Sequence, residues 1–141
     1  MIKGSCVFCK KPFSTRHQIK YCSGLCQKMH RNSLFVDRWD KGLETGMIGI
    51  STRVTSAHIR TFLIFASGEK CSHCGWNEKN PLTGKVPLEV DHIDGDSENN
   101  AKANLRLLCP NCHSLTPYFR NLNKGRGRKW RTSKYKKNNE R

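Results

Sequence analysis

Eight cysteines constrain what this 141-residue chain can fold into more than any other feature of the sequence. They form four close pairs, here called knuckles: Cys6/Cys9, Cys22/Cys26, Cys71/Cys74 and Cys109/Cys112. A knuckle points two sulfur atoms at one ion about 2.3 Å away, and four such sulfurs complete the tetrahedron that Zn2+ prefers. Joining neighbouring knuckles gives two four-cysteine sites with no cysteine left over. The alternatives, scattered buried thiols or a redox Cys-x-x-Cys motif, do not account for this arithmetic.

The low hydrophobic content also indicates that bound metal helps to stabilise the fold. Only 35% of the residues are hydrophobic, which is too few for a large core, so another source of stability must help to hold the fold. Disulfides do not persist in a reducing cytoplasm, whereas thiolate–metal bonds do. No apolar run approaches the ~18 residues of a membrane helix, and the N-terminus lacks the apolar core of a secretory signal. We therefore expect a soluble cytoplasmic protein with two structural Zn2+ ions and no membrane partner.

The net charge of +15 is unevenly distributed. Residues 1–60 carry eleven basic and three acidic side chains, residues 61–119 carry five and seven, and residues 120–141 carry ten and one. Each zinc bound by four thiolates contributes −2, which leaves a net charge of about +11. Basic flanks around an acidic centre favour a polyanion held by the flanks and a cation held by the centre. A merely solvated basic surface is the alternative.

The same features divide the chain into four parts. We interpret residues 1–40 as an N-terminal four-cysteine zinc finger with a helical extension, because Ser23 can cap a helix that starts in the second knuckle. The three glycines within residues 41–54 indicate a linker. Residues 55–119 form the acidic domain that contains the second zinc site, and residues 120–141 form a basic tail. The fold class expected is small α+β, stabilised by zinc.

The acidic domain begins with a predicted helix at about residues 56–67. Thr55 or Ser56 can cap its start and Gly68 can end it. Its apolar residues recur at positions i, i+3, i+4 and i+7, as in a helix that buries one face.

Two strands and a short helix are predicted next. Residues 86–93 alternate between apolar and acidic side chains, which is typical of a strand with one buried face. Residues 104–108 form a second candidate strand, and Pro110 fits the first turn of a helix. That helix carries Cys112 and His113.

Four polar residues of this unit stand out as a candidate site. Asp91 and His92 end the first strand, Asn104 starts the second, and His113 follows the last zinc cysteine. A carboxylate and an imidazole form a sparse site for a divalent ion and leave positions to water and a phosphate oxygen. Since adjacent strand residues face opposite ways, His92 needs a kink or bulge to share the site. A neutral histidine can take a proton from an attacking water.

These residues resemble a known family. Asp91-His92-Ile93, Asn104-Leu105 and the run at 109–113 (Cys-Pro-Asn-Cys-His) are similar to the HNH endonucleases in their zinc-stapled form. The stretch from about Ile59 to Lys129 resembles free-standing, homing-type HNH endonucleases of bacteriophages. The resemblance implies a ββα-metal, treble-clef-like nuclease domain at residues 55–119. It also implies the cytoplasm of the host cell, if the chain is phage-encoded.

The resemblance also implies roles for the site residues. Asp91 and His113 bind the catalytic metal, which is Mg2+ most often and Mn2+ or another divalent ion in some relatives. His92 is the general base that activates water, and Asn104 orders the loop and orients His92. Cys71, Cys74, Cys109 and Cys112 are structural. The products expected are 5′-phosphate and 3′-hydroxyl ends.

DNA, most simply double-stranded, is the expected partner, and the basic tail is the expected grip. Glycines interleave with its cations and let the backbone approach phosphates closely. The residues predicted to bind DNA are Lys124, Arg126, Arg128, Lys129 and Arg131. A homodimer or a phage protein partner, and the choice between nicking and double-strand cleavage, stay open. The other readings are a non-catalytic zinc module that binds nucleic acid, and an HNH nuclease active only with a phage DNA-packaging partner.

Overall fold

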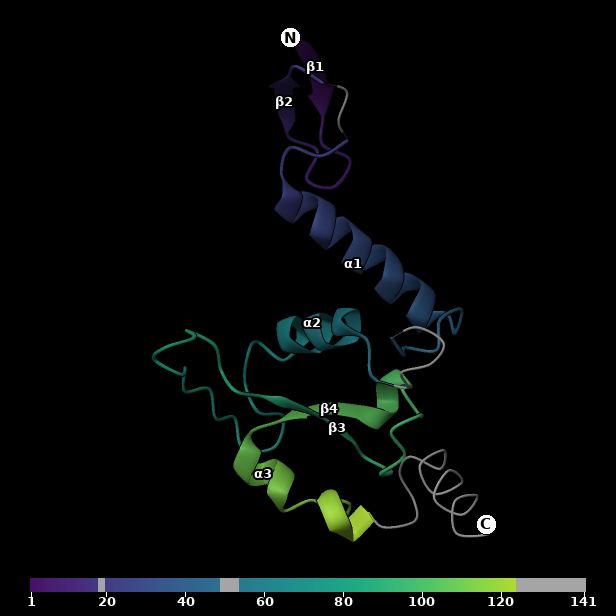
Figure 1. Cartoon of the computed structure of the whole chain (residues 1–141), viewed down its shortest axis with the longest axis vertical. Coiled ribbons are helices and arrows are strands. Elements are labelled where there is room, and N and C mark those ends of the chain that lie inside the picture. Colours follow the sequence, from purple (N-terminus) through teal and green to yellow (C-terminus); the bar gives the residue numbers. More distant parts are fainter. Residues whose placement is uncertain (18–19, 49–53, 124–141) are drawn as a thin grey trace, which may run out of the picture. The chain divides into compact units, whose positions relative to one another are not determined.

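A computed structural model describes residues 1–17, 20–48 and 54–123 (Figure 1). The residues predicted to bind DNA in the tail lie outside this described part. The chain divides into two compact units, Met1–Glu44 and Thr45–Arg141. The boundary falls within residues 41–54, the segment interpreted as a linker. No helix in the described part is both long and apolar enough to cross a bilayer.

The N-terminal unit is a hairpin followed by one long helix (Figure 1). Strands β1 (Ile2–Ser5) and β2 (Pro12–Thr15) pair antiparallel, and the first knuckle lies in the turn between them. Helix α1 spans Gly24–Asp40. The predicted cap is confirmed, because the Ser23 hydroxyl accepts the backbone N–H of Cys26 at 3.2 Å. The helix therefore starts inside the second knuckle and continues for 17 residues.

A histidine of α1 joins the helix to the knuckles. The His30 ring packs against Phe8, with ring centroids 6.1 Å apart, and against Tyr21 at 5.6 Å. The Tyr21 hydroxyl also hydrogen-bonds His30 Nδ1 at 3.0 Å. These contacts supply a minimal core in a unit that has few apolar residues, so the unit relies on its cysteines for much of its stability.

The second unit opens with helix α2 (Ala57–Ala66). Ser56 caps it by accepting the backbone N–H of His58, and Gly68 follows its end with a φ of +65°, a conformation that glycine adopts without strain. The prediction of this helix is confirmed. Ile59 is fully buried, and Leu63 and Ile64 pack against the core of the unit.

Beneath α2 lies a two-stranded antiparallel sheet of β3 (Glu89–His92) and β4 (Leu105–Leu108). Both strands fall within the predicted segments, but β3 is shorter than residues 86–93. A tight backbone turn, in which Leu88 N–H donates to Val86 O, keeps the chain from pairing before Glu89. A second turn, from Gly95 N–H to His92 O, ends the strand.

Helix α3 (Pro110–Ser114) follows β4 directly and carries Cys112 and His113, as predicted. The Cys109 sulfur caps it by accepting the Cys112 backbone N–H. The core between α2, the sheet and α3 is built from cysteines and leucines, namely Cys71, Leu88, Leu107, Leu108 and Cys109. The second four-cysteine cluster is thus part of the core of this unit.

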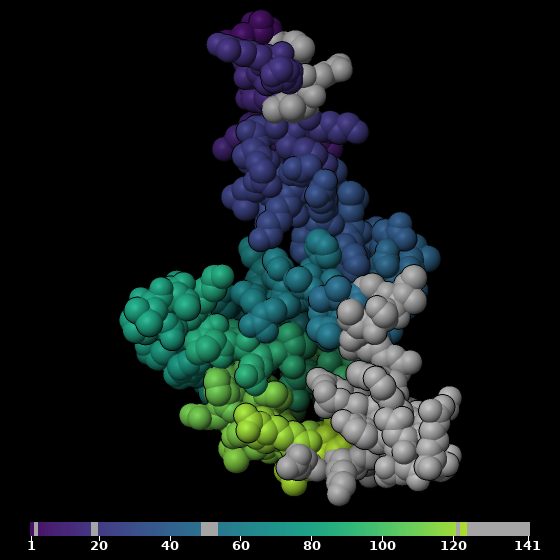
Figure 2. Space-filling view, viewed as in Figure 1, coloured from purple at the N-terminus to yellow at the C-terminus, as the bar shows by residue number. Residues whose placement is uncertain are grey.

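Two peripheral segments complete the unit. The connection at residues 77–85 stands away from the sheet as a separate projection (Figures 1 and 2), and the Asn80 side chain orders it by accepting two backbone N–H groups. Beyond α3, a short 3-10 helix, η2 (Arg120–Asn123), covers Gly95. The Asn123 amide donates to Gly95 O at 2.7 Å. The first residues of the predicted tail therefore belong to the folded unit.

Candidate functional site

Both predicted cysteine sites form in the structure. The sulfurs of Cys6, Cys9, Cys22 and Cys26 lie within 4.8 Å of one another, as do those of Cys71, Cys74, Cys109 and Cys112. Four sulfurs at such spacing fit a tetrahedral metal ion, and Zn2+ is the ion that four thiolates favour. The second cluster joins the segment after α2 to the start of α3, which fixes where His113 stands.

The pKa values of two thiols in the second cluster favour a bound cation. Burial opposes ionisation of Cys71, but backbone N–H groups, those of Cys74 and Cys109 foremost, lower the pKa of the Cys71 thiol to about 6. Burial, with hydrogen bonds that the Cys112 thiol donates to the sulfurs of Cys109 and Cys74, raises the pKa of the Cys112 thiol to about 12. Four sulfurs this close cannot all ionise against one another, and a divalent metal removes that conflict.

The Asp91 carboxylate lies between an arginine and a histidine. Asp91 is only 6% exposed, and its cross-strand partner in the sheet is Arg106. Arg106 Nε donates to Asp91 Oδ2 at 2.8 Å, while Asp91 Oδ1 stands 3.7 Å from His113 Nε2. The predicted juxtaposition of Asp91 and His113 is therefore present. An oxygen and a nitrogen this close can bind one divalent ion after a small adjustment.

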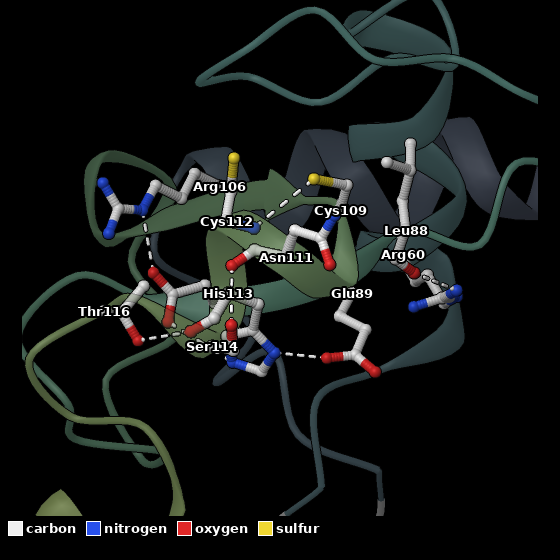
Figure 3. Close-up of polar contacts among 11 residues, drawn as sticks. Arg60, Leu88, Glu89, Arg106, Cys109, Asn111, Cys112, His113, Ser114 and Thr116 are labelled. Carbon is white, nitrogen blue, oxygen red and sulfur yellow. Dashed lines mark hydrogen bonds and ion pairs between the residues drawn. The ribbon is translucent and has the colours of Figure 1, made fainter.

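A second carboxylate orients the histidine. Glu89 lies two residues before Asp91 and on the same face of β3, and its Oε2 hydrogen-bonds His113 Nδ1. Figure 3 shows the His113 ring directed toward the Glu89 side chain, with a dashed line marking their contact. Because a carboxylate accepts, Nδ1 carries the hydrogen and Nε2, the atom that faces Asp91, keeps its lone pair. This is the tautomer that a metal ligand needs.

His92 is held on the other side of the strand. Its Nε2 hydrogen-bonds Asn100 Oδ1 at 3.1 Å, and the Thr55 hydroxyl donates to the same oxygen at 2.9 Å. An amide oxygen only accepts, so His92 Nε2 carries the hydrogen and Nδ1 is free to take a proton. The expected bulge is absent, since Asp91 and His92 pair with consecutive residues of β4. The two side chains therefore leave opposite faces of the strand end.

Asn104 braces the loop that joins the strands. Its amide nitrogen donates to Asp94 Oδ1 and to Asn99 O, both at 2.8 Å, and its Oδ1 accepts the Asp94 N–H. Burial alone would raise the pKa of Asp94, but hydrogen bonds from Asn99 and Asn104 hold it below its usual range. Asn104 thus contacts the loop, whereas the ring of His92 contacts Asn100 instead.

Sequence reasoning did not assign Glu89, Arg106 or Asn100 to the site. The strand period did place Glu89 on the face of Asp91, which was a usable signal. Arg106 depends on the register between two strands separated by a 12-residue connection, and the register is not readable from composition. Asn100 depends on the path of that connection, which only the folded structure shows.

Fold and site together define a small α+β domain, built on a four-cysteine cluster, with a carboxylate–imidazole pair beside that cluster. Residues 71–116 match the family model described as HNH endonuclease. The match contains all three elements β3, β4 and α3 and each of the four predicted site residues. This match agrees with the resemblance to HNH endonucleases noted in the sequence.

A curated relative points the same way. The chain is 48% identical over 60 residues to the H-N-H endonuclease F-TflIV of Escherichia phage T5. That alignment covers 40% of this chain and 24% of the phage protein, so the chain spans about a quarter of its relative's length. The comparison with solved structures gives no match.

Proposed function

We propose that this protein is a metal-dependent DNA endonuclease of phage type, with its active site at the end of β3. The observation that carries the proposal is the approach of Asp91 to His113, at 3.7 Å, beside a four-cysteine cluster. The family match to residues 71–116 and the phage relative support it. In this reading β3, β4 and α3 form the ββα-metal motif of the nuclease domain.

Asp91 Oδ1 and His113 Nε2 are the proposed ligands of the catalytic ion. When bound, a Mg2+ or Mn2+ ion would neutralise charge on the scissile phosphate and stabilise the leaving 3′-oxygen. An oxygen and a nitrogen donor suit such ions, although Mg2+ prefers oxygen and would keep several waters. The remaining ligands are supplied by water and by the DNA.

His92 is the proposed general base. Its free Nδ1 can take the proton of the attacking water while Asn100 holds the Nε2–H, and a neutral imidazole is the group that most often performs this task. In an in-line displacement, nucleophile and leaving group stand on opposite sides of phosphorus. A phosphate placed across the end of β3 would be flanked by the base and the metal ligands, which leave opposite faces there.

Glu89 and Arg106 are proposed as positioning residues. Each touches one metal ligand and holds it in a single orientation: Glu89 fixes the ring of His113, and Arg106 fixes the carboxylate of Asp91. Asn104 orders the loop beyond His92 through Asp94 and Asn99. Such contacts reduce the reorganisation needed when the ion and the phosphate arrive.

The remaining expectations extend this proposal. We propose structural zinc in both cysteine clusters and a zinc-finger role for the N-terminal unit. Double-stranded DNA is the proposed substrate, gripped in part by the basic tail, and the cytoplasm is the proposed location. Cleavage of one defined site in a genome that lacks the chain's own gene would support a homing role.

A plasmid-nicking assay tests the proposed activity. Zinc-loaded protein with Mg2+ or Mn2+ should relax supercoiled plasmid and leave 5′-phosphate ends. His92→Ala should reduce the rate by about 100-fold or more, the size of a lost general base. His73→Ala is the matched control, because His73 is an exposed histidine in a knuckle, and it should cut normally.

The outcomes separate the remaining alternatives. An intact plasmid with every divalent ion, together with tight DNA binding, would favour a non-catalytic zinc module. Cutting that starts only when a phage DNA-packaging protein is added would show a partner-dependent nuclease. Equal rates for His92→Ala and wild type would remove His92 from the mechanism.

A further inference from the structure

The N-terminal unit lies outside the matched residues 71–116 and carries an unusual charge distribution. Residues 1–36 contain seven basic side chains and no acidic one. All seven are exposed, and within the described residues none is ion-paired with a carboxylate. They are Lys3, Lys10, Lys11, Arg16, Lys20, Lys28 and Arg31, here called the cationic surface.

The acidic groups of this unit stand at the other end of α1. Asp37 pairs with Lys41 at 2.8 Å, and Glu44 pairs with Arg38 at 2.9 Å. Six residues of helix, a rise of about 9 Å, separate Asp37 from Arg31, the nearest cation of the surface on this helix. This is about the Debye length of 8 Å at physiological salt, and Asp37 is already paired with Lys41. The unit's own carboxylates therefore do little to neutralise the cationic surface.

The fold presents these cations on a fixed frame. Lys10 and Lys11 directly follow the first knuckle, whose turn closes through hydrogen bonds from Cys6 N–H to Lys11 O and from Lys10 N–H to Cys6 O. Lys28 and Arg31 lie three residues apart on one face of α1. His30 ties that helix to the knuckles. Figure 1 shows the hairpin gathered at the N-terminal end of α1.

We propose that the cationic surface binds the phosphate backbone of duplex DNA and gives the protein a second grip besides its nuclease domain. Cations without internal partners release condensed counterions when they meet phosphates, and this release drives binding without regard to sequence. Because the knuckle and the helix hold these cations in place, less conformational entropy is lost when several of them contact phosphates at once. The choice of DNA as the ligand rests on the proposed function, but DNA can bind to this surface whether or not the protein hydrolyses it.

Matched double variants of the full chain test this surface. Lys28→Gln with Arg31→Gln removes two cations from it, whereas Arg38→Gln with Lys41→Gln removes two that are ion-paired at the other end of α1. Each pair is placed in a His92→Ala background, so that a fluorescent 25-base-pair duplex stays uncut in Mg2+. Anisotropy is measured from 50 to 200 mM KCl.

The first double variant should bind about tenfold more weakly and lower the log–log salt slope by nearly 2, about 0.9 per lost phosphate contact. The control should keep the parent's slope. As a control for folding, both double variants must contain two zinc ions per chain and give the circular dichroism spectrum of the parent. Equal slopes for the two double variants would overturn the proposal, and so would tighter binding of the parent to an RNA duplex.

Failure of this inference can be told apart from failure of the nuclease proposal. The same double variants with His92 intact are assayed for plasmid nicking. DNA binding through the cationic surface without nicking would leave the second grip standing and refute the nuclease. Nicking, with both variants binding equally, would do the reverse.

Discussion

At the scale of single residues, the site consists of pairs in which one side chain fixes the other. Arg106 holds Asp91, Glu89 holds His113 and Asn100 holds His92. The three inner residues were expected from the sequence because their types suit the chemistry. Their three partners were not, because each partner depends on strand register or loop path rather than on residue type. Glu89 came nearest, since alternation alone puts it on the face of Asp91.

Glu89→Gln should weaken the site without removing a metal ligand. A glutamine nitrogen can turn toward His113 and no longer fixes which ring nitrogen carries the hydrogen, so the affinity for Mn2+ should fall by about 10 to 100-fold. Isothermal titration of zinc-loaded protein with Mn2+ measures this. Glu78→Gln, an exposed acidic residue in the projection at residues 77–85, is the control and should titrate as wild type.

At the scale of elements, local sequence patterns predicted where the helices and strands lie. They did not predict where β3 starts and ends, or how η2 docks. The caps at Ser23 and Ser56 and the proline at the start of α3 marked the helix starts correctly. The shortness of β3 comes from a backbone turn at Leu88 before the strand and one at Gly95 after it, which no periodicity reveals. The docking of η2 on Gly95 was likewise unforeseen, because the tail was read by its charge alone.

The Gly95 contact predicts a steep cost for a single methyl group. A Cβ at this position would lie 2.6 Å from Tyr118 Cγ, and the φ of +74° is unfavourable for alanine. Gly95→Ala should lower the free energy of unfolding by about 3 kcal/mol, the sum of overpacking and backbone strain. Gly84→Ala has a φ of +64° with nothing within 4 Å, so it should cost only about 1 kcal/mol. Chemical denaturation of both variants measures the difference.

The cysteine clusters predict separate losses. Cys112→Ser should cut the zinc content from two ions per chain to one and abolish nicking, because structural zinc binding contributes about 10 kcal/mol or more to folding. Cys26→Ser should also lose one zinc, from the other unit, and keep the nuclease domain folded. Colorimetric zinc release together with nicking distinguishes the two. If both variants keep two zinc ions, the proposed pairing of the knuckles is wrong.

At the scale of the whole molecule, two compact units divide a strongly basic chain. The proposed chemistry is confined to the second unit, in an acidic stretch that DNA would otherwise avoid. The affinity for DNA must therefore come from other parts of the chain. The charge distribution indicated this from the sequence, since it needs no knowledge of the fold.

Removal of residues 124–141 tests how much of that affinity the tail supplies. These residues carry nine basic side chains and one acidic one, so the truncated protein should bind duplex DNA more weakly and show a flatter salt dependence. Its zinc content and unfolding midpoint should match those of the full chain. An unchanged log–log slope would show that the tail does not contact phosphates.

His113 follows Cys112 without a single intervening residue. A cysteine of the structural cluster and a proposed ligand of the catalytic ion are thus neighbours on one short helix. A scarcity of zinc would therefore disturb the position of His113 together with the core that the second cluster belongs to. In a cell, the proposed DNA cleavage would then depend on the supply of an ion that the proposed mechanism does not itself use.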